Sequence, residues 1–334
     1  MKNYFKFNLT GRKLLPVWLF YMFLFLIPYI CIQVRMQSFK AQPTADPHET
    51  MQHMSEIGGL FGIMLLLMIV RYAISFFIAK MSIENTEFKL KNFEFGGRFG
   101  EFIGMLILGF FLSIITLGIY SPWFIKKVYD FFSENSTHDS NSFKFNGKGK
   151  DLFIIITLLI IATMCIFAVF GMITAVSLLT KNPSHAPSPI GSISIFIAIL
   201  ILMIPYLYYV TKWSINFTFK SYTIKLETQL WASLGKIALE LLLSVITLGI
   251  YLPLAYLKLY QYFMENTFAE SDEKSKTFGY DMEAGSDFLF IWGQLLLSII
   301  TLGFYFPWAY CKVADCIMSK TYSEDIEMDE FAIE

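Results

Sequence analysis

Three lysines recur at one fixed spacing in the chain and could bind an anion. Each lies fourteen positions after the serine that opens a recurring nine-residue phrase. They are Lys127, Lys258 and Lys312. Three cations at equivalent positions could line an anion path or hold lipid phosphate. Long cationic side chains also reach toward the membrane surface as plain anchors, and the sequence leaves both interpretations open.

Charged residues also interrupt stretches that are otherwise apolar. Arg71 lies in one such stretch, and Lys236 and Glu240 lie in another, one helical turn apart, so that their side chains can face each other. Ionisable groups within membrane segments often mark functional sites. The alternative is that Lys236 lies near the membrane surface and only pairs with Glu240.

The residues that would support other kinds of chemistry do not form recognisable motifs. There is no phosphate-binding glycine loop, metal-ligand cluster or nucleophile elbow, so we expect no catalytic residues, no metal and no cofactor, and enzyme activity is the least favoured function. The formal net charge is −1, which argues against a nucleic-acid partner.

The nine-residue phrase itself predicts a sharp turn between two helices. It reads Ser-Ile-Ile-Thr-Leu-Gly-Ile-Tyr-Ser in its first copy and is followed by proline. Glycine suits the end of a helix, and Ser-Pro suits an N-cap followed by proline at the first helical position. The turn residues are Gly118, Pro122, Gly249, Pro253, Gly303 and Pro307.

Composition indicates that lipid surrounds much of the chain. The sequence is 55% hydrophobic and 16% charged, whereas soluble domains have about 25% charged residues. A spanning helix needs about 20 apolar residues. Seven stretches approach or exceed that length: 14–34, 57–79, 102–120, 152–179, 190–211, 231–251 and 288–306.

These patterns predict an all-α polytopic membrane protein built from tandem repeats with helix–turn–helix units. Alternating aromatics before glycine, as in Phe143-Lys-Phe, add small β-hairpins at the membrane face. The expected divisions are a first membrane repeat (1–142), a second (143–286), a third unit (287–322) and an acidic disordered tail (323–334).

The distribution of lysine and arginine predicts that each phrase-bearing unit enters the membrane and returns to the side from which it entered. If all seven stretches cross the membrane, lysine and arginine divide evenly between its two sides. If each phrase-bearing unit turns back, 21 lie inside with the N-terminus and three lie outside. The objection is that the second arm is short, and that it could instead lie along the membrane surface.

The sequence resembles the YjgN family, a bacterial inner-membrane family of unknown function. The resemblance rests on Ile-Thr-Leu-Gly-Ile-Tyr-x-Pro-Trp, the following lysine, Glu-Asn-Thr, and Phe-x-Phe-x-Gly, over roughly 80–322. The second unit departs from this pattern with Leu254 in place of tryptophan, and the third has Ser319-Lys320-Thr321 in place of Glu-Asn-Thr. The resemblance implies the bacterial inner (cytoplasmic) membrane, and it implies no substrate.

Two functions therefore compete. Internal duplication, broken segments and intramembrane charge resemble the construction of transporters, so the first is a transporter or channel for a small solute or ion. The second is a non-catalytic structural or assembly protein of the envelope that interacts with anionic lipid. Both make membrane lipids a partner, and the N-terminus is expected in the cytoplasm. The sequence leaves the oligomeric state open.

Overall fold

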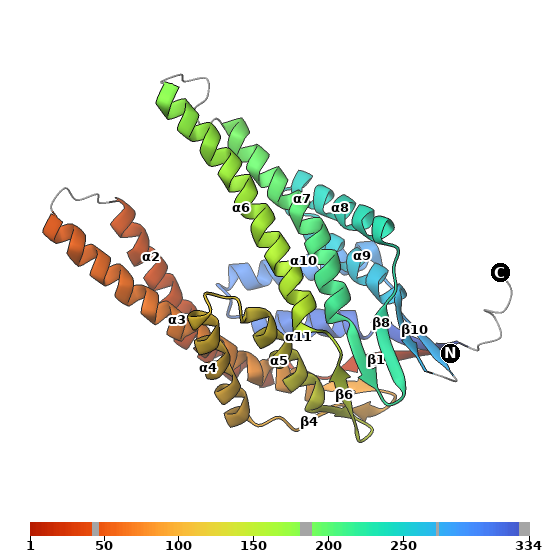
Figure 1. Ribbon diagram of the computed structural model, residues 1–334. Coiled ribbons are helices and arrows are strands. Elements are labelled where there is room, and N and C mark those ends of the chain that lie inside the picture. The colour runs from red at the N-terminus through yellow and green to blue at the C-terminus, as the bar shows by residue number, and fades with distance from the viewer. Residues whose placement is uncertain (42–46, 181–188, 272–273, 327–334) are drawn as a thin grey trace.

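Five helical hairpins rise from one β-sheet (Figure 1). The computed structural model describes residues 1–41, 47–180, 189–271 and 274–326. Two hairpins are long. The first combines α1 (Gly11–Tyr21), a π-helical turn η1 (Met22–Leu26) and α2 (Ile27–Ala41) with α3 (Pro47–Glu84), and the other pairs α6 (Gly149–Thr180) with α7 (Pro189–Ser214).

Three hairpins are short, and each contains one copy of the repeated phrase. The first short hairpin is α4 (Phe99–Ile115) with α5 (Ser121–Glu134). The second is α8 (Leu230–Ile246) with α9 (Leu252–Glu265), and the third is α10 (Ala284–Ile300) with α11 (Phe306–Met318). Both arms of each short hairpin connect to the sheet, so the chain leaves the sheet and returns to it.

The expectation of an all-α protein was wrong, because the expected small hairpins join into one antiparallel sheet of 11 strands. The strands are β1 (Lys2–Phe7), β2 (Thr86–Phe88), β3 (Lys91–Asn92), β4 (Glu94–Phe95), β5 (Ser136–His138), β6 (Asn141–Phe145), β7 (Asn216–Phe219), β8 (Tyr222–Leu226), β9 (Thr267–Glu270), β10 (Ser275–Tyr280) and β11 (Thr321–Ile326). The predicted acidic tail begins inside β11, and residues 327–334 lie outside the described residues.

The sheet is nearly closed on itself. Its order is β3-β2-β1-β11-β10-β9-β8-β7-β6-β5-β4, so that β3 and β4, which Phe93 separates in the chain, stand at its two ends. β3 pairs with β2 and β4 pairs with β5. The segment 91–95 therefore bridges both ends, and the sheet leaves little of the free edge that would invite pairing with another chain.

The alternating aromatics place one face of the sheet against the helices. Phe145 pairs with Phe217, which pairs in turn with Ile224, so these side chains share a face. Their neighbours Lys144 and Lys225 point to the opposite face and are exposed. One apolar face and one polar face are what a half-buried antiparallel sheet requires.

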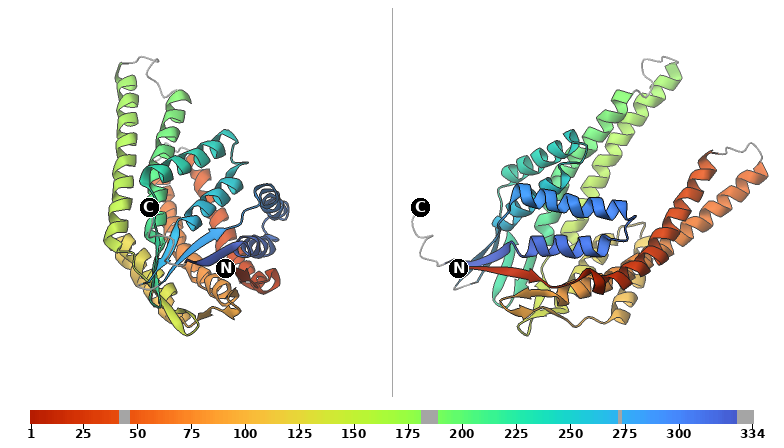
Figure 2. Two further views of the ribbon diagram at one scale, coloured as in Figure 1. Left: turned by 90° about the vertical axis from the view of Figure 1, so that its right-hand side faces the viewer. Right: turned by 180° about the vertical axis from the view of Figure 1, so that it is seen from behind.

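The helices follow the same closed order as the strands. α3 packs on α4, α5 on α6, α7 on α8 and α9 on α10, and α11 returns to α1. Figure 2 shows the long hairpins extending well beyond the sheet.

Four helices are long and apolar enough to cross a membrane: Gly11–Ser38, His53–Glu84, Gly149–Ile173 and Ile193–Ser214. The count of seven stretches was too high, because 102–120, 231–251 and 288–306 each overlap a helix of only 17 residues and then run into the turn that ends it. Within the part of the chain that the structure describes, there are thus four candidate membrane spans and three shorter hairpins.

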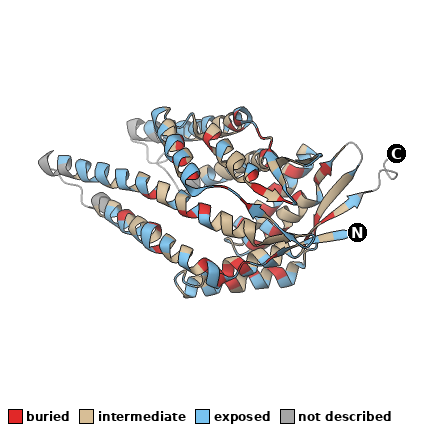
Figure 3. Cartoon of the chain, turned by 90° about the horizontal axis from the view of Figure 1, so that it is seen from below, coloured by how far each residue is buried: buried red, intermediate tan, exposed pale blue. Residues whose placement is uncertain are grey.

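Burial is concentrated where the helices meet the sheet, and the outer parts of the long hairpins are largely exposed (Figure 3). The exposed residues there are apolar, such as Leu158, Met164 and Phe167. The tips of the short hairpins are also apolar and exposed, with Leu117 and Leu248 at 93%. Apolar surface of this extent fits contact with lipid.

Tryptophan and glycine form two of the joints between neighbouring hairpins. A Cβ on Gly11 of α1 would lie 2.6 Å from the ring of Trp308 in α11, and one on Gly149 of α6 would lie 2.7 Å from Trp123 in α5. The second short hairpin has Leu254 at this place, and the following Gly285 has no atom within 4 Å of its Cβ position. Substitutions at these glycines therefore test the joints.

We expect Gly149→Ala and Gly11→Ala to lower the free energy of unfolding by about 1–3 kcal/mol through overpacking. Gly285→Ala is the matched control, and it should be neutral or slightly stabilising because alanine favours helix. Thermal unfolding of the purified chain in detergent measures all three. Equal effects at Gly149 and Gly285 would contradict the packing argument.

One carboxylate ties three separate parts of the sheet together. Asp139, in the tight turn between β5 and β6, contacts the ammonium of Lys91 in β3 and accepts a 3.0 Å hydrogen bond from Lys220 in the turn after β7. The hydrogen bonds from Lys91 and Lys220 lower the pKa of Asp139 to about 2.

We expect this carboxylate to stabilise the fold at neutral pH and to lose that effect in acid. Its pKa is lower in the folded chain than in the unfolded one, so the contribution is present above pH ~4 and disappears as the pH falls toward ~2. The measurement is the difference in unfolding temperature between the native chain and Asp139→Asn across that range. A difference that does not change with pH would refute the role.

Candidate functional site

Each short hairpin turns through the same backbone geometry. Leu117 and Gly118 have φ of 51° and 89°. Both lie in the left-handed region, where glycine is favoured. Leu248 and Gly249 have φ of 51° and 87°, and Leu302 and Gly303 have φ of 49° and 86°.

The threonine of the phrase joins the two helices of each hairpin. The Thr116 hydroxyl donates to the Leu112 carbonyl at the end of α4 (2.7 Å) and accepts from the Tyr120 backbone N–H at the start of α5 (3.0 Å). Thr247 and Thr301 make the same pair of bonds. One hydroxyl thus binds a backbone carbonyl at the end of the first helix and a backbone N–H at the start of the second, where such groups lack partners within the helix.

The second helix begins earlier than the Ser-Pro pattern predicts. α5 starts at Ser121, so Pro122 lies in its first turn but after the first residue, and Tyr120 holds the N-cap position without a side-chain cap. Pro253 and Pro307 lie in the same place in α9 and α11. The first N–H groups of α5, those of Trp123 and Phe124, donate to the Tyr120 carbonyl at 3.1 Å, so Ser121 is already a helical residue.

The recurring lysine lies close to the tyrosine that ends each turn. Lys258 Nζ donates to the Tyr251 hydroxyl at 2.7 Å, and Lys312 Nζ donates to the Tyr305 hydroxyl at 3.0 Å. Lys127 lies 5.9 Å from the centre of the Tyr120 ring. Tyrosine and lysine are seven positions apart in each case, which is about two helical turns, so the pair shares one helix face.

The second short hairpin extends this pair into a buried charge network. The Tyr251 hydroxyl donates to Glu240 Oε2 at 2.8 Å. Lys236 Nζ approaches Glu240 Oε1 at 3.3 Å. The Glu240 side chain is 1% exposed and that of Lys236 is 34% exposed. A carboxylate this deeply buried requires such partners, and it has an ammonium on one oxygen and a phenol on the other.

The other two short hairpins keep the tyrosine and lysine but change the buried group. In the third, Gln294 takes the place of Glu240, and its Oε1 accepts from the Tyr305 hydroxyl at 2.9 Å. In the first, Gly109 takes that place, and a Cβ there would lie 2.1 Å from the ring of Phe124. With the same backbone turn, the second hairpin thus buries a carboxylate at this place, the third an amide and the first an aromatic ring.

The structure places the predicted residues in separate surroundings. Lys236 and Glu240 are in contact, as their spacing predicts. The three recurring lysines lie in three hairpins, each near its own tyrosine. Arg71 is exposed on α3, with its guanidinium 5.8 Å from the centre of the Phe25 ring, so it belongs to the first long hairpin.

Sequence reasoning missed the residues that complete the network. The tyrosines were visible inside the phrase but were assigned no role, and Gln294 was not noticed. Counting four positions back from each phrase serine gives Gly109, Glu240 and Gln294. That alignment, with the tyrosine seven positions after the serine and the lysine seven after that, would have found the whole set.

A second buried carboxylate lies at the base of the third short hairpin. Asp287 is 2% exposed and accepts from Lys320 Nζ at 2.6 Å and from the Glu283 backbone N–H at 3.0 Å. Its counterpart in the second hairpin is Ser233, which is bonded to Tyr262. Because Asp287 has its own cation and lies in the first turn of α10, it acts as a structural helix anchor.

The family described as "Bacterial protein of unknown function (DUF898)" matches residues 2–287, which is most of the sequence. The chain belongs to this family.

A curated relative agrees with the resemblance drawn from the repeated phrase. The inner membrane protein YjgN of Salmonella typhimurium is 34% identical over 67 residues, covering 20% of this chain and 17% of that protein. The match therefore spans less than a fifth of the relative's length. The resemblance to the YjgN family is confirmed. No solved structure matches the chain.

The comparison of hairpins predicts how the buried network responds to substitution. Lys236→Met leaves the Glu240 carboxylate without its ammonium and should lower the free energy of unfolding by about 1–3 kcal/mol, less than a fully buried pair would lose because Lys236 is partly exposed. Adding Glu240→Gln should recover most of that loss, since the third hairpin has Phe290 and Gln294 at these two positions.

A double-mutant cycle in detergent, with unfolding followed by circular dichroism, measures the coupling between Lys236 and Glu240. A double variant whose loss of stability equals the sum of the losses in Lys236→Met and Glu240→Gln alone would show that the two side chains do not depend on each other.

Proposed function

We propose that this protein is a transporter or channel for a small anionic solute in the bacterial inner membrane. The observation that supports this most is the Lys236–Glu240–Tyr251–Lys258 network between α8 and α9, which is centred on the buried Glu240 carboxylate. A charged group is expensive to keep at membrane depth, so a network of this kind is retained where it handles charge.

The network contains one more ammonium group than carboxylates, so one ammonium is available to bind an anion. Two ammonium groups, on Lys236 and Lys258, share one carboxylate on Glu240. Glu240 is already matched by Lys236, and the group that accepts from Lys258 is the neutral hydroxyl of Tyr251. The Lys258 ammonium, half-buried on α9, can therefore receive an anion.

We further propose that the N-terminus and the sheet lie on the cytoplasmic side of the membrane. The lysine and arginine count favours a cytoplasmic N-terminus. The first strand belongs to the sheet, whose polar face carries Lys144 and Lys225. With the sheet in the cytoplasm, the long hairpins would cross the membrane, and the short ones would enter it and return. The inner-membrane location of the YjgN relative is consistent with this arrangement.

The test is flux of small anions into proteoliposomes that contain the full chain. Lys258→Met should lower the flux at least about tenfold, which corresponds to a barrier higher by about 1.4 kcal/mol. Lys258→Arg should retain part of the flux. Lys312→Met is the matched control, because its tyrosine meets an amide and not a carboxylate. If no anion in a broad panel passes through the native chain, the proposal fails.

A second candidate is a non-catalytic envelope protein that holds anionic lipid. It is favoured by the exposure of Lys127 and Lys312 on short hairpins whose tips are apolar. This candidate predicts that anionic phospholipid copurifies with the chain and decreases in Lys127→Met and Lys312→Met, while the proteoliposomes show no flux. Those two outcomes together would replace transport with lipid anchoring.

A further inference from the structure

A groove of about 590 Å³ runs between the two helices of the second long hairpin, α6 and α7. Along α6 its lining extends from Asp151 to Ala162, which are eleven positions apart, or about 16 Å along a helix. The candidate span Gly149–Ile173 begins two positions before Asp151. The groove therefore starts where the hairpin leaves the sheet and continues to membrane depth. Its volume falls within the range of small-molecule pockets.

The part of the groove that lies away from the sheet is apolar. Leu158 and Leu159 line it on α6, and Leu202 lines it on α7. Ala162 and Pro205 contribute only short side chains, which leaves room between the two helices. Leu158 is exposed, so an alkyl chain in the groove would cover apolar surface.

The sheet end of the groove carries polar groups that are available to a ligand. Asp151 is the first lining residue of α6, and Tyr206 and Tyr209 are the last two of α7. The Trp213 indole N–H donates to the Lys148 carbonyl at 2.9 Å, which places the end of α7 level with the start of α6. Among the residues that the structure describes, none forms an ion pair with Asp151 or a hydrogen bond with the two phenols.

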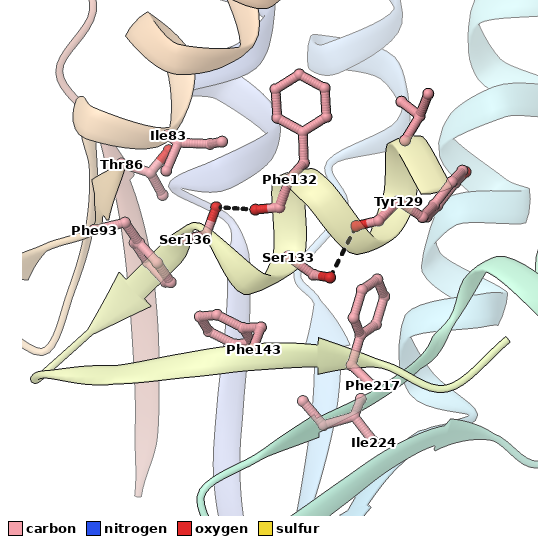
Figure 4. Close-up of a pocket in the computed structure, with 11 residues that line it drawn as sticks. Ile83, Thr86, Phe93, Tyr129, Phe132, Ser133, Ser136, Phe143, Phe217 and Ile224 are labelled. Atoms are coloured by element: carbon pink, nitrogen blue, oxygen red, sulfur yellow. Dashed lines mark hydrogen bonds between the residues drawn. The ribbon is translucent and has the colours of Figure 1, made fainter. Parts of the chain in front are cut away.

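A cavity of about 460 Å³ under α5 differs in this respect. Figure 4 shows it between α5 and the sheet, with Phe132 on the helix and Phe143 on the strand. The Ser133 hydroxyl donates to the Tyr129 carbonyl and the Ser136 hydroxyl to the Phe132 carbonyl, so both are used within the protein. No described residue in its lining carries a charge. The carboxylate thus sets the groove between α6 and α7 apart.

The first long hairpin has the opposite charge at the position that matches Asp151. Gly11 and Gly149 occupy equivalent joints against tryptophan at the start of α1 and α6. Two positions after these glycines, α1 has Lys13 and α6 has Asp151, and both side chains are exposed. The duplication therefore does not require a carboxylate here.

The two phenols are also specific to the second long hairpin. The pattern Lys-x-Ser-Ile occurs near the end of both α3 and α7, and it aligns Lys80 with Lys212. This alignment places Ile74 and Phe77 where α7 has its two groove tyrosines. The carboxylate and both hydroxyls are thus found together in one hairpin and are replaced together in the other.

We infer that the groove between α6 and α7 binds a phospholipid whose headgroup ends in a primary ammonium. The ammonium pairs with the Asp151 carboxylate and donates to the hydroxyls of Tyr206 and Tyr209, and one acyl chain follows the groove toward Ala162. A carboxylate beside aromatic rings is a favourable site for an alkylammonium, because charge-assisted hydrogen bonds and cation–π contacts add together. This site is separate from the lysines assigned above to anion handling.

The second charge of such a headgroup also has a partner. Lys212 lies in the last turn of α7, three positions beyond Tyr209 and nearer the sheet, and is exposed. The headgroup phosphate can pair with Lys212 on α7 while the ammonium pairs with Asp151 on α6. A headgroup with a phosphate but no amine would instead bring a like charge toward Asp151. The headgroup then lies beside the sheet and the acyl chain at membrane depth, as in a bilayer leaflet.

The experiment titrates the delipidated full chain in detergent with three dioleoyl phospholipids that differ only in headgroup. These are phosphatidylethanolamine, phosphatidylglycerol and phosphatidylcholine, and native mass spectrometry measures how much of each is bound. The ethanolamine lipid should bind at least about tenfold more tightly than the glycerol lipid. It should also bind more tightly than the choline lipid, whose quaternary ammonium has no N–H to donate.

Variants assign that preference to the groove. Asp151→Asn should weaken binding of the ethanolamine lipid at least about tenfold and abolish the preference. Glu101→Gln is the matched control, because it removes an exposed carboxylate from the first turn of α4, outside the groove. Asp151→Lys places the charge of the first long hairpin in the groove and should reverse the preference toward the glycerol lipid.

Two further variants keep the test decisive if Asp151→Lys does not fold. Tyr206→Phe combined with Tyr209→Phe keeps the rings, and it should weaken the ethanolamine lipid more than the choline lipid. Ala162→Trp fills the deep end of the groove and should weaken all three lipids, whereas Ile161→Trp, at an exposed position outside the lining, should weaken none. The inference is overturned if the native chain binds the three lipids equally, or if Asp151→Asn retains the native preference.

Discussion

The architecture depends on hydrogen bonds between the two ends of the chain. β1 lies between β2 and β11, with Lys2 opposite Glu324 and Phe7 opposite Thr86. Without these pairs the sheet would expose two long edges beside a membrane, where unpaired backbone groups are costly and invite aggregation. Closing the sheet also sets the order of the helices, because each hairpin leaves one strand and returns to the next. The joint between Gly11 and Trp308 follows from that closure, because α1 begins after β1 and α11 ends before β11.

Local features of the sequence predicted local features of the structure. The glycine of the phrase turns the chain, Lys236 meets Glu240 across one helical turn, and alternating aromatics form strands. The sheet was not predictable by the same reasoning, because strands of two to six residues carry little signal and their partners can lie more than 300 positions away. The lengths of the spans were misjudged for a related reason. The apolar residues of each phrase continue the helix in sequence, while Leu117 and Gly118 end it in space.

The three short hairpins show how one backbone can hold different buried groups. Thr, Leu, Gly and Tyr keep the turn constant, and the lysine keeps its position two turns into the second helix. The position that faces the tyrosine is free to vary, since a glycine there is compensated by Phe124 and an amide accepts the same hydrogen bond as a carboxylate. Only the carboxylate needs a further cation, and Lys236 occurs only in that hairpin. In the second hairpin, the ion pair of Glu240 and Lys236 thus lies where the first hairpin has the contact between Gly109 and Phe124.

The pairing of β1 with β11 also has a consequence for biosynthesis. A ribosome makes the first strand early, yet one of its two partners emerges only after the last hairpin has been translated. Contacts so distant along the chain form slowly. During that interval the exposed side of β1 needs protection from other nascent chains, while the strands from β4 to β10 can already pair with one another. Folding of this protein is therefore expected to end with the insertion of β11 between β1 and β10. A chain truncated before residue 321 would leave the sheet open between those two strands.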